Sequence, residues 1–130
     1  MTRPAISKFL RGYVEAALFS TTDETTPSGG YPLDRNYGID DIDDDTLARM
    51  AHECAAFQCQ VESVLQWCDA GDEQAGRDFW FTRNGHGVGY WETDRGYDVD
   101  RGEYLTRVAH AYGEVYLFAG PNGVDDGRVR

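Results

Sequence analysis

The stretch Asp78–Trp91, DFWFTRNGHGVGYW, decides which fold the chain is expected to adopt. Its Asn84-Gly85 pair lies between two runs that are rich in aromatic residues, 78–83 and 88–93. Aromatic residues favour strands, and Asn-Gly favours a two-residue hairpin because both central residues of a type I′ turn take positive φ. The stretch therefore predicts a β-hairpin with Asn84 and Gly85 at its tip.

In such a hairpin, the alternate glycines of this stretch would leave space for a neighbouring group to pack against the strand. In the predicted register Arg83 faces His86 near the tip, and Trp80 faces Gly89. Glycine inside a strand usually marks the close approach of another group. Three candidates remain open for that group: the Trp80 ring lying across Gly89, a helix, or an outside ligand. A phosphate-binding loop would instead need its glycines to lead into a helix. The stretch leads into strand-like residues, so no nucleotide or other cofactor is expected.

The rest of the chain divides into helices, loops and one further strand. Apolar residues at three- and four-residue spacing predict helices over 4–20, from Asp43 to about residue 69, and over 101–112. Residues 21–38 read as a long loop, 115–119 as a strand, and 124–130 as an edge strand or a frayed end. The prediction is a single α+β domain over 1–130. Its order is α-α-β-β-α-β, and its helices pack on a small, mostly antiparallel sheet.

The net charge and the hydropathy of the chain indicate which classes of partner it is expected to bind. The 130 residues carry a net charge of −11, and the sequence pI is about 4.5. Such a chain repels phosphate backbones, so direct nucleic-acid binding is not expected. No apolar run is long enough for a membrane span, and Lys8, Arg11 and Glu15 interrupt any secretory leader. The favoured partner is a protein with a basic surface or a basic nucleic-acid groove.

An acidic run, IDDIDDD, precedes the second predicted helix, and two interpretations of it remain open. Its carboxylates belong to Asp40, Asp41, Asp43, Asp44 and Asp45. In the first interpretation Asp43 caps the helix, and the next two carboxylates complement the helix dipole. In the second, the run presents negative charge to a positive groove, as a DNA mimic does.

No complete catalytic or metal-binding arrangement is recognisable in the sequence. His86 would need a carboxylate to orient it before it could act as a base. The cysteines Cys54, Cys59 and Cys68 lack a CxxC spacing, so no metal site is expected. Arg83, Asn84 and His86 are therefore predicted to contact a partner from the hairpin tip. A small enzyme that uses His86 with a nearby carboxylate is the alternative.

Four segments of the chain resemble one group of proteins. They are YVEAALFSTTDE, YPLDRNYGIDDI, AGRDFWFTRNGHGVGYWETDRG and LTRVAHAYGEVYLFAGPNG, and together they extend over about residues 13–123. These segments resemble small, mostly uncharacterised acidic proteins of tailed bacteriophages and prophages. The resemblance implies a role in the cytoplasm of an infected host.

The resemblance also suggests a class of function. Small acidic phage proteins often bind and block host machinery, including restriction and CRISPR complexes, which is an analogy at the level of class. The expectation is a non-enzymatic accessory protein, present as a monomer or homodimer. A homodimeric structural or regulatory protein that associates through Trp80 and Trp91 is a further alternative.

Overall fold

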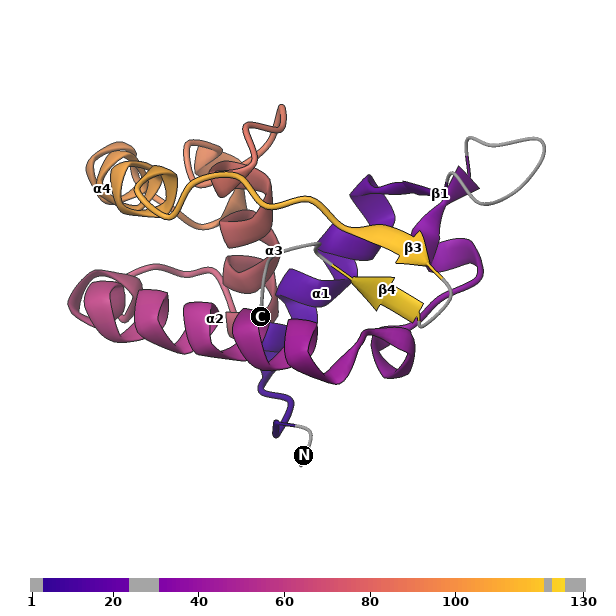
Figure 1. The fold of residues 1–130 in the computed structure, drawn as a ribbon. Helices are drawn as coiled ribbons and strands as arrows, with labels where there is room; N and C mark the ends of the chain where they lie inside the picture. The colour runs from indigo at the N-terminus through magenta and orange to yellow at the C-terminus, as the bar shows by residue number, and fades with distance from the viewer. Residues whose placement is uncertain (1–3, 24–30, 121–122, 126–130) are drawn as a thin grey trace.

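The computed structural model describes residues 4–23, 31–120 and 123–125 (Figure 1). Its α-helices are α1 (Lys8–Ser20), α2 (Asp44–Leu65), α3 (Asp72–Arg83) and α4 (Val99–His110). Its strands are β1 (Thr22–Asp23), β2 (Tyr31–Pro32), β3 (Phe118–Gly120) and β4 (Gly123–Asp125). Three 3-10 turns connect them: η1 (Leu33–Arg35), η2 (Ile39–Asp41) and η3 (Thr93–Arg95).

Helices α1 and α3 pack against each other with their backbones in contact. A Cβ atom on Gly76 would lie 1.9 Å from the carbonyl oxygen of Phe9, and one on Gly12 would lie 2.0 Å from that of Glu73. Each helix therefore places a glycine where the other helix passes. No larger residue fits at either position without separating the two helices.

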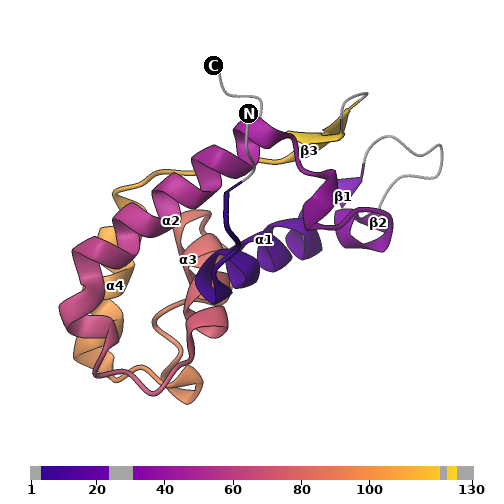
Figure 2. The same ribbon diagram turned by 90° about the horizontal axis from the view of Figure 1, so that it is seen from below.

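An aromatic cluster joins this helix pair to α2. The Phe57 ring of α2 stacks on the Phe79 ring of α3, with 4.1 Å between centroids. The Tyr13 ring of α1 meets the Trp80 ring edge-on at 5.3 Å. Offset and edge-on ring pairs stabilise a core beyond the area they bury. Helix α4 completes the helical body beside α2 and α3 (Figure 2).

The strands form two small antiparallel pairs, β1–β2 and β3–β4, at the end of the molecule away from α4 (Figure 1). Strand β4 is fastened to the start of α2. The backbone N–H of Asp43 donates to the carbonyl of Val124 at 2.9 Å, and the Thr46 hydroxyl donates to the Asp125 carboxylate at 3.3 Å. This attachment brings the end of the described chain next to the acidic run.

Several sequence predictions are confirmed. The class is α+β, with helices and small antiparallel sheets. The first, second and last helices form within the predicted segments or within two residues of them, and Asp43 caps α2 by accepting from the N–H of Thr46 at 3.4 Å. None of the described helices is long and apolar enough to cross a membrane.

The predicted loop and the predicted C-terminal segment contain more structure than expected. Strands β1 and β2 and the turn η1 fall within 21–38, while residues 24–30 lie outside the described part of the chain. Strand β3 begins at Phe118, later than the strand predicted over 115–119. Within 124–130, residues 124 and 125 belong to β4, and residues 126–130 lie outside the described part.

The predicted hairpin at Asn84-Gly85 is wrong. Residues 72–83 form α3, and the Asn-Gly pair ends this helix, with Gly85 in the left-handed conformation at φ 68°. Glycine after a helix is as typical a use of that conformation as a hairpin turn. Ala75, Gly76, Phe79 and Trp80 are buried at helical spacing, and their packing against α1 overrides the strand preference of the aromatic residues. The 88–93 run is irregular and ends in η3.

Gly89 makes room for side chains other than Trp80. A Cβ atom on Gly89 would lie 2.4 Å from the Thr82 hydroxyl oxygen and 2.5 Å from the Trp91 ring. Gly89 therefore does leave space for an aromatic ring, but the ring is that of Trp91 and not that of Trp80. The Thr82 hydroxyl also accepts the N–H of Tyr90 at 3.1 Å, which holds this segment against α3.

We predict that Gly76→Ala lowers the free energy of unfolding by about 1–3 kcal/mol, the usual cost of overpacking. The added methyl group would meet the Phe9 carbonyl at 1.9 Å, and this clash exceeds the gain in helix propensity of about 1 kcal/mol. Urea denaturation measures the change. Gly38→Ala is the control, because a Cβ atom there has no atom within 4 Å and φ is −123°. Equal stability of the two variants would contradict the close approach of α1 and α3.

Candidate functional site

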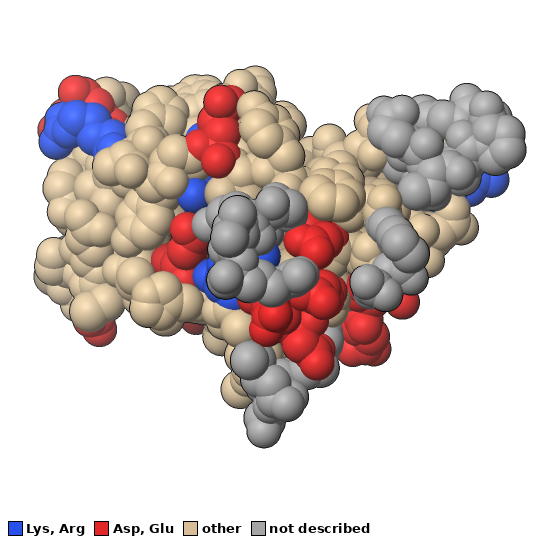
Figure 3. All heavy atoms as spheres, in the orientation of Figure 1, with Lys and Arg blue, Asp and Glu red and all other residues tan. Residues whose placement is uncertain are grey.

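The acidic run lies at the surface where η2 meets α2 (Figure 3). We call this group the acidic cluster; it comprises Asp40, Asp41, Asp43, Asp44, Asp45 and Asp125. Asp40, Asp41 and Asp44 are exposed, and Asp43 and Asp45 are half-buried. The hydrogen bond from Thr46 brings in Asp125. The sequence could not indicate that member, because a tertiary contact places it there.

The backbone under the acidic cluster is held in a defined conformation. The Asp41 carboxylate accepts the backbone N–H of Gly38 at 2.7 Å, and the N–H of Asp41 donates to the Gly38 carbonyl at 3.0 Å. Asp43 caps α2. The two interpretations of the run are therefore compatible, because Asp41 and Asp43 support local structure while other members, such as Asp40, extend into solvent.

The sequence predicts that Arg83 contacts a partner, but in the structure Arg83 is buried. The residue is 3% exposed, and its guanidinium donates to four acceptors. These are the carbonyl of Gly113 at 2.7 Å, the carbonyl of Tyr112 at 2.8 Å, the Tyr13 hydroxyl at 3.1 Å and the Glu53 carboxylate at 3.1 Å. Arg83 thereby joins α3 to α1, α2 and the segment after α4. Its role is to hold the helices together.

Asn84 also takes part in internal hydrogen bonds. Its amide nitrogen donates to the Trp80 carbonyl at 3.0 Å, and its amide oxygen accepts the N–H of Val115 at 2.7 Å. The side chain thus closes α3 and fixes the segment that leads to β3. Asn84 is half-buried, so part of it can still reach a partner.

His86 is half-buried and lies beside an aromatic ring. Its ring meets that of Phe81 edge-on at 5.6 Å, and the residue lines a hollow of about 350 Å³ with Trp80, Tyr116 and Phe118. None of the hydrogen bonds or ion pairs among the described residues involves the His86 ring. Among the described residues, therefore, no carboxylate is hydrogen-bonded to the His86 ring.

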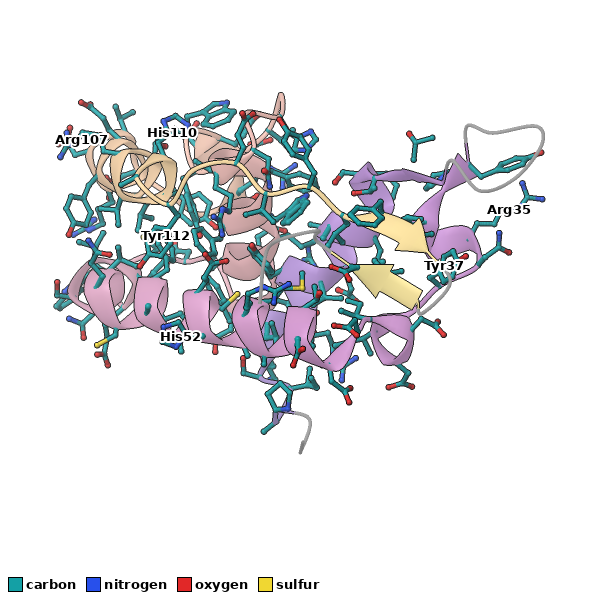
Figure 4. All side chains as sticks on the ribbon, in the orientation of Figure 1. Arg35, Tyr37, His52, Arg107, His110 and Tyr112 are labelled. Atoms are coloured by element: carbon teal, nitrogen blue, oxygen red, sulfur yellow. The ribbon has the colours of Figure 1, made fainter. Side chains whose placement is uncertain are left out.

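The other histidines and the cysteines do not gather into a site. His52 and His110 are exposed on α2 and α4 (Figure 4). Cys54 is buried, and burial raises the pKa of its thiol, whereas Cys59 is exposed. Within the described ranges, no group of three or more His, Cys, Asp or Glu side chains is arranged to hold a metal ion.

The face proposed for dimerisation is not continuous at the surface. Trp80 is 2% exposed, and its indole N–H donates to the Ser20 hydroxyl at 2.8 Å. Trp91 is 43% exposed. A dimer formed through both tryptophans would require Trp80 to leave the core, so this route to a homodimer has no structural support.

Sequence reasoning missed a buried carboxylate on α3. Asp78 is 0% exposed and accepts from three side chains. The donors are the Gln74 amide at 2.9 Å, the Tyr97 hydroxyl at 2.7 Å and the Arg95 guanidinium at 3.1 Å. Burial raises the pKa of Asp78 against the opposing effect of these donors. The network attaches η3 and Tyr97 to α3. The sequence analysis assigned Asp78 to a strand and therefore could not predict this network. Gln74 and Asp78, four residues apart, are neighbours only on a helix.

An apolar groove of about 490 Å³ adjoins the acidic cluster. Its apolar walls come from α1, from the segment between β2 and α2 and from the end of α3. They consist of Val14, Ala16, Leu18, Phe19, Tyr37, Ile39 and Phe81. Figure 4 shows Tyr37 on the segment between β2 and α2. Phe19 is 63% exposed, and its place off the apolar stripe of the first helix is the sequence signal that could have identified it.

Comparison of the chain with models of protein families, with curated proteins and with solved structures gave no match. The candidate surfaces therefore rest on their own geometry.

We predict that Arg83→Ala lowers the free energy of unfolding by about 3–5 kcal/mol, the usual cost of breaking a buried ion pair. The substitution removes donors from two carbonyls, a tyrosine hydroxyl and Glu53. Arg107→Ala is the control, because Arg107 and Glu103 form an exposed pair, with side chains 66% and 68% accessible. Such pairs contribute at most about 1 kcal/mol. Thermal and urea unfolding would detect the difference, and a fully stable Arg83→Ala protein would contradict the structural role.

We predict that the stabilising contribution of Asp78 falls as pH rises. Its pKa is raised in the folded protein, so the folded state binds the proton more tightly than the unfolded state does. The contribution is complete below the ordinary aspartate pKa and is lost as pH passes through the raised value. Urea denaturation of the parent and Asp78→Asn over a pH series measures the difference. A difference that is constant, or that grows in favour of the parent with pH, would refute the shift.

Proposed function

We propose that this protein is a non-enzymatic accessory protein of a phage or prophage that binds a host protein and blocks its functional surface. The observation that carries the proposal is the acidic cluster, which is presented at the surface on a hydrogen-bonded turn and a capped helix. The resemblance to small acidic phage proteins supports the biological setting, which is the host cytoplasm.

The proposed mechanism is occlusion guided by charge. A net charge of −11 attracts a partner that carries a basic surface, and complementary charges speed the encounter of two proteins. The acidic cluster then covers the basic site. A nucleic-acid groove is the most suitable target, since carboxylates can take the place of phosphates. Inhibition of a restriction or CRISPR complex by a DNA mimic is one form of this proposal.

The apolar groove supports a protein partner. A surface that combines exposed aromatic side chains with charged residues is typical of protein interfaces. Phe19 and the acidic cluster provide these two components on neighbouring segments.

The test begins with the partner. The parent protein, immobilised, would capture host proteins from nuclease-treated lysate, and the captured protein would be identified by mass spectrometry and purified. A variant with Asn at 40, 41, 43, 44 and 45 should bind it about tenfold more weakly at low salt, or about 1.4 kcal/mol. Its affinity should also depend less on salt, because fewer charges take part.

A charge-matched variant separates local from overall charge. Glu62, Asp72, Asp94, Asp100 and Glu103 are exposed on other parts of the molecule. Their conversion to amides also changes the net charge from −11 to −6, since five carboxylates are removed. This variant should keep most of the affinity. Equal affinity of the parent and the variant with Asn at 40, 41, 43, 44 and 45 would rule out the acidic cluster as the contact surface.

A further inference from the structure

The apolar groove has the size and lining of a site for a large apolar side chain. Its lining combines Val14 and Leu18 of α1, which are buried, with the exposed Phe19 and the half-buried Phe81. Burial of one leucine- or phenylalanine-sized side chain removes apolar surface from water and so favours binding. The volume of about 490 Å³ is open to solvent at Phe19, which is 63% exposed. An apolar group from another molecule can therefore enter without displacing the core.

The charges around the groove favour a basic occupant. Arg77 is paired with Glu15 at 3.5 Å and with Glu73 at 3.8 Å, so its charge is already compensated. The guanidinium of Arg35 lies over the Tyr31 ring at 3.8 Å. Among the residues that line the groove, the carboxylates Glu15 and Asp34 are matched in number by Arg11 and Arg77. The excess of negative charge comes from Asp40 and Asp41, which directly follow the lining residue Ile39.

The groove and the acidic cluster are parts of one surface. Gly38 and Ile39 line the groove, and Asp40 and Asp41 follow them directly in the turn η2. A ligand whose apolar side chain occupies the groove thus has these carboxylates next to it. Contact with both parts requires an extended molecule that carries an apolar group and positive charge close together.

We propose that the groove binds a segment of a partner protein in which a large apolar side chain is flanked by lysine or arginine. The apolar side chain packs between Phe19 and Phe81, and the flanking cations face Asp34, Asp40 and Asp41. Aromatic residues in well-packed pockets commonly dominate binding energy, and surrounding charges set specificity. The inference rests on the proposed function and adds the chemistry of the recognised segment.

Synthetic peptides provide the probe. One fluorescein-labelled peptide would have two leucines and a tryptophan between pairs of lysines. A second would have serine in place of the apolar residues, and a third would have glutamate in place of lysine. Fluorescence anisotropy should show the first peptide binding at least about tenfold more tightly than either of the others. Equal binding of all three peptides, or no binding of the first, would overturn the inference.

Groove-filling variants locate the binding. Gly38→Trp would add an indole at the groove, because Gly38 lines it and a Cβ atom there has no atom within 4 Å. This variant should weaken binding of the first peptide at least about tenfold. Gly71→Trp, at an exposed position with equal space, should leave it unchanged. Phe19→Ala, which alters a largely exposed side chain, is a second variant if Gly38→Trp does not fold.

Binding of the captured host partner to the two kinds of variant distinguishes failure of this inference from failure of the proposed function. Loss of binding in the variant with Asn at 40, 41, 43, 44 and 45, with full binding by Gly38→Trp, would leave the acidic surface in place and refute the groove. Loss of binding in both variants supports the two together. Full binding by both would refute both.

Discussion

The close approach of α1 and α3 is the constraint on which the other contacts depend. Gly12 and Gly76 allow the two backbones to touch, and this contact sets the positions of the side chains on both helices. Phe79 then meets Phe57 of α2, and Trp80 meets Tyr13. A side chain at either glycine would separate the helices and misalign these rings. The aromatic core is thus a consequence of two residues that have no side chain.

Helix α3 also carries the two buried charged residues that connect the molecule. Arg83 reaches α1, α2 and the segment after α4. Asp78 holds η3 and Tyr97. Because every donor or acceptor left unpaired in the interior costs free energy, each network admits few alternative arrangements. The irregular segment 84–98 has a defined course for this reason, although it contains little regular secondary structure.

The surface formed by the acidic cluster and the apolar groove combines negative charge with apolar side chains. The β3–β4 pair attaches to the start of α2 through Asp43 and Thr46, and so supports the acidic cluster from beneath. Phe81 lines the groove beside it, and the ring of Phe81 also meets that of His86 edge-on. This arrangement gives our proposal its physical content: charge brings a basic partner to this face, and an apolar side chain then anchors it.

The sequence by itself determined those features that depend on local interactions. The helices α1, α2 and α4, the Asp43 cap, the surface position of the acidic run and the α+β class could all be predicted, because each follows from residues close together in the chain. Asn84-Gly85 was ambiguous, since the same left-handed glycine ends a helix or turns a hairpin. The packing of α3 against α1, which includes Gly76 against Phe9, decided for the helix. The burial of Arg83, the addition of Asp125 to the acidic cluster and the groove beside Phe19 likewise arise from contacts between distant segments, which no local pattern encodes.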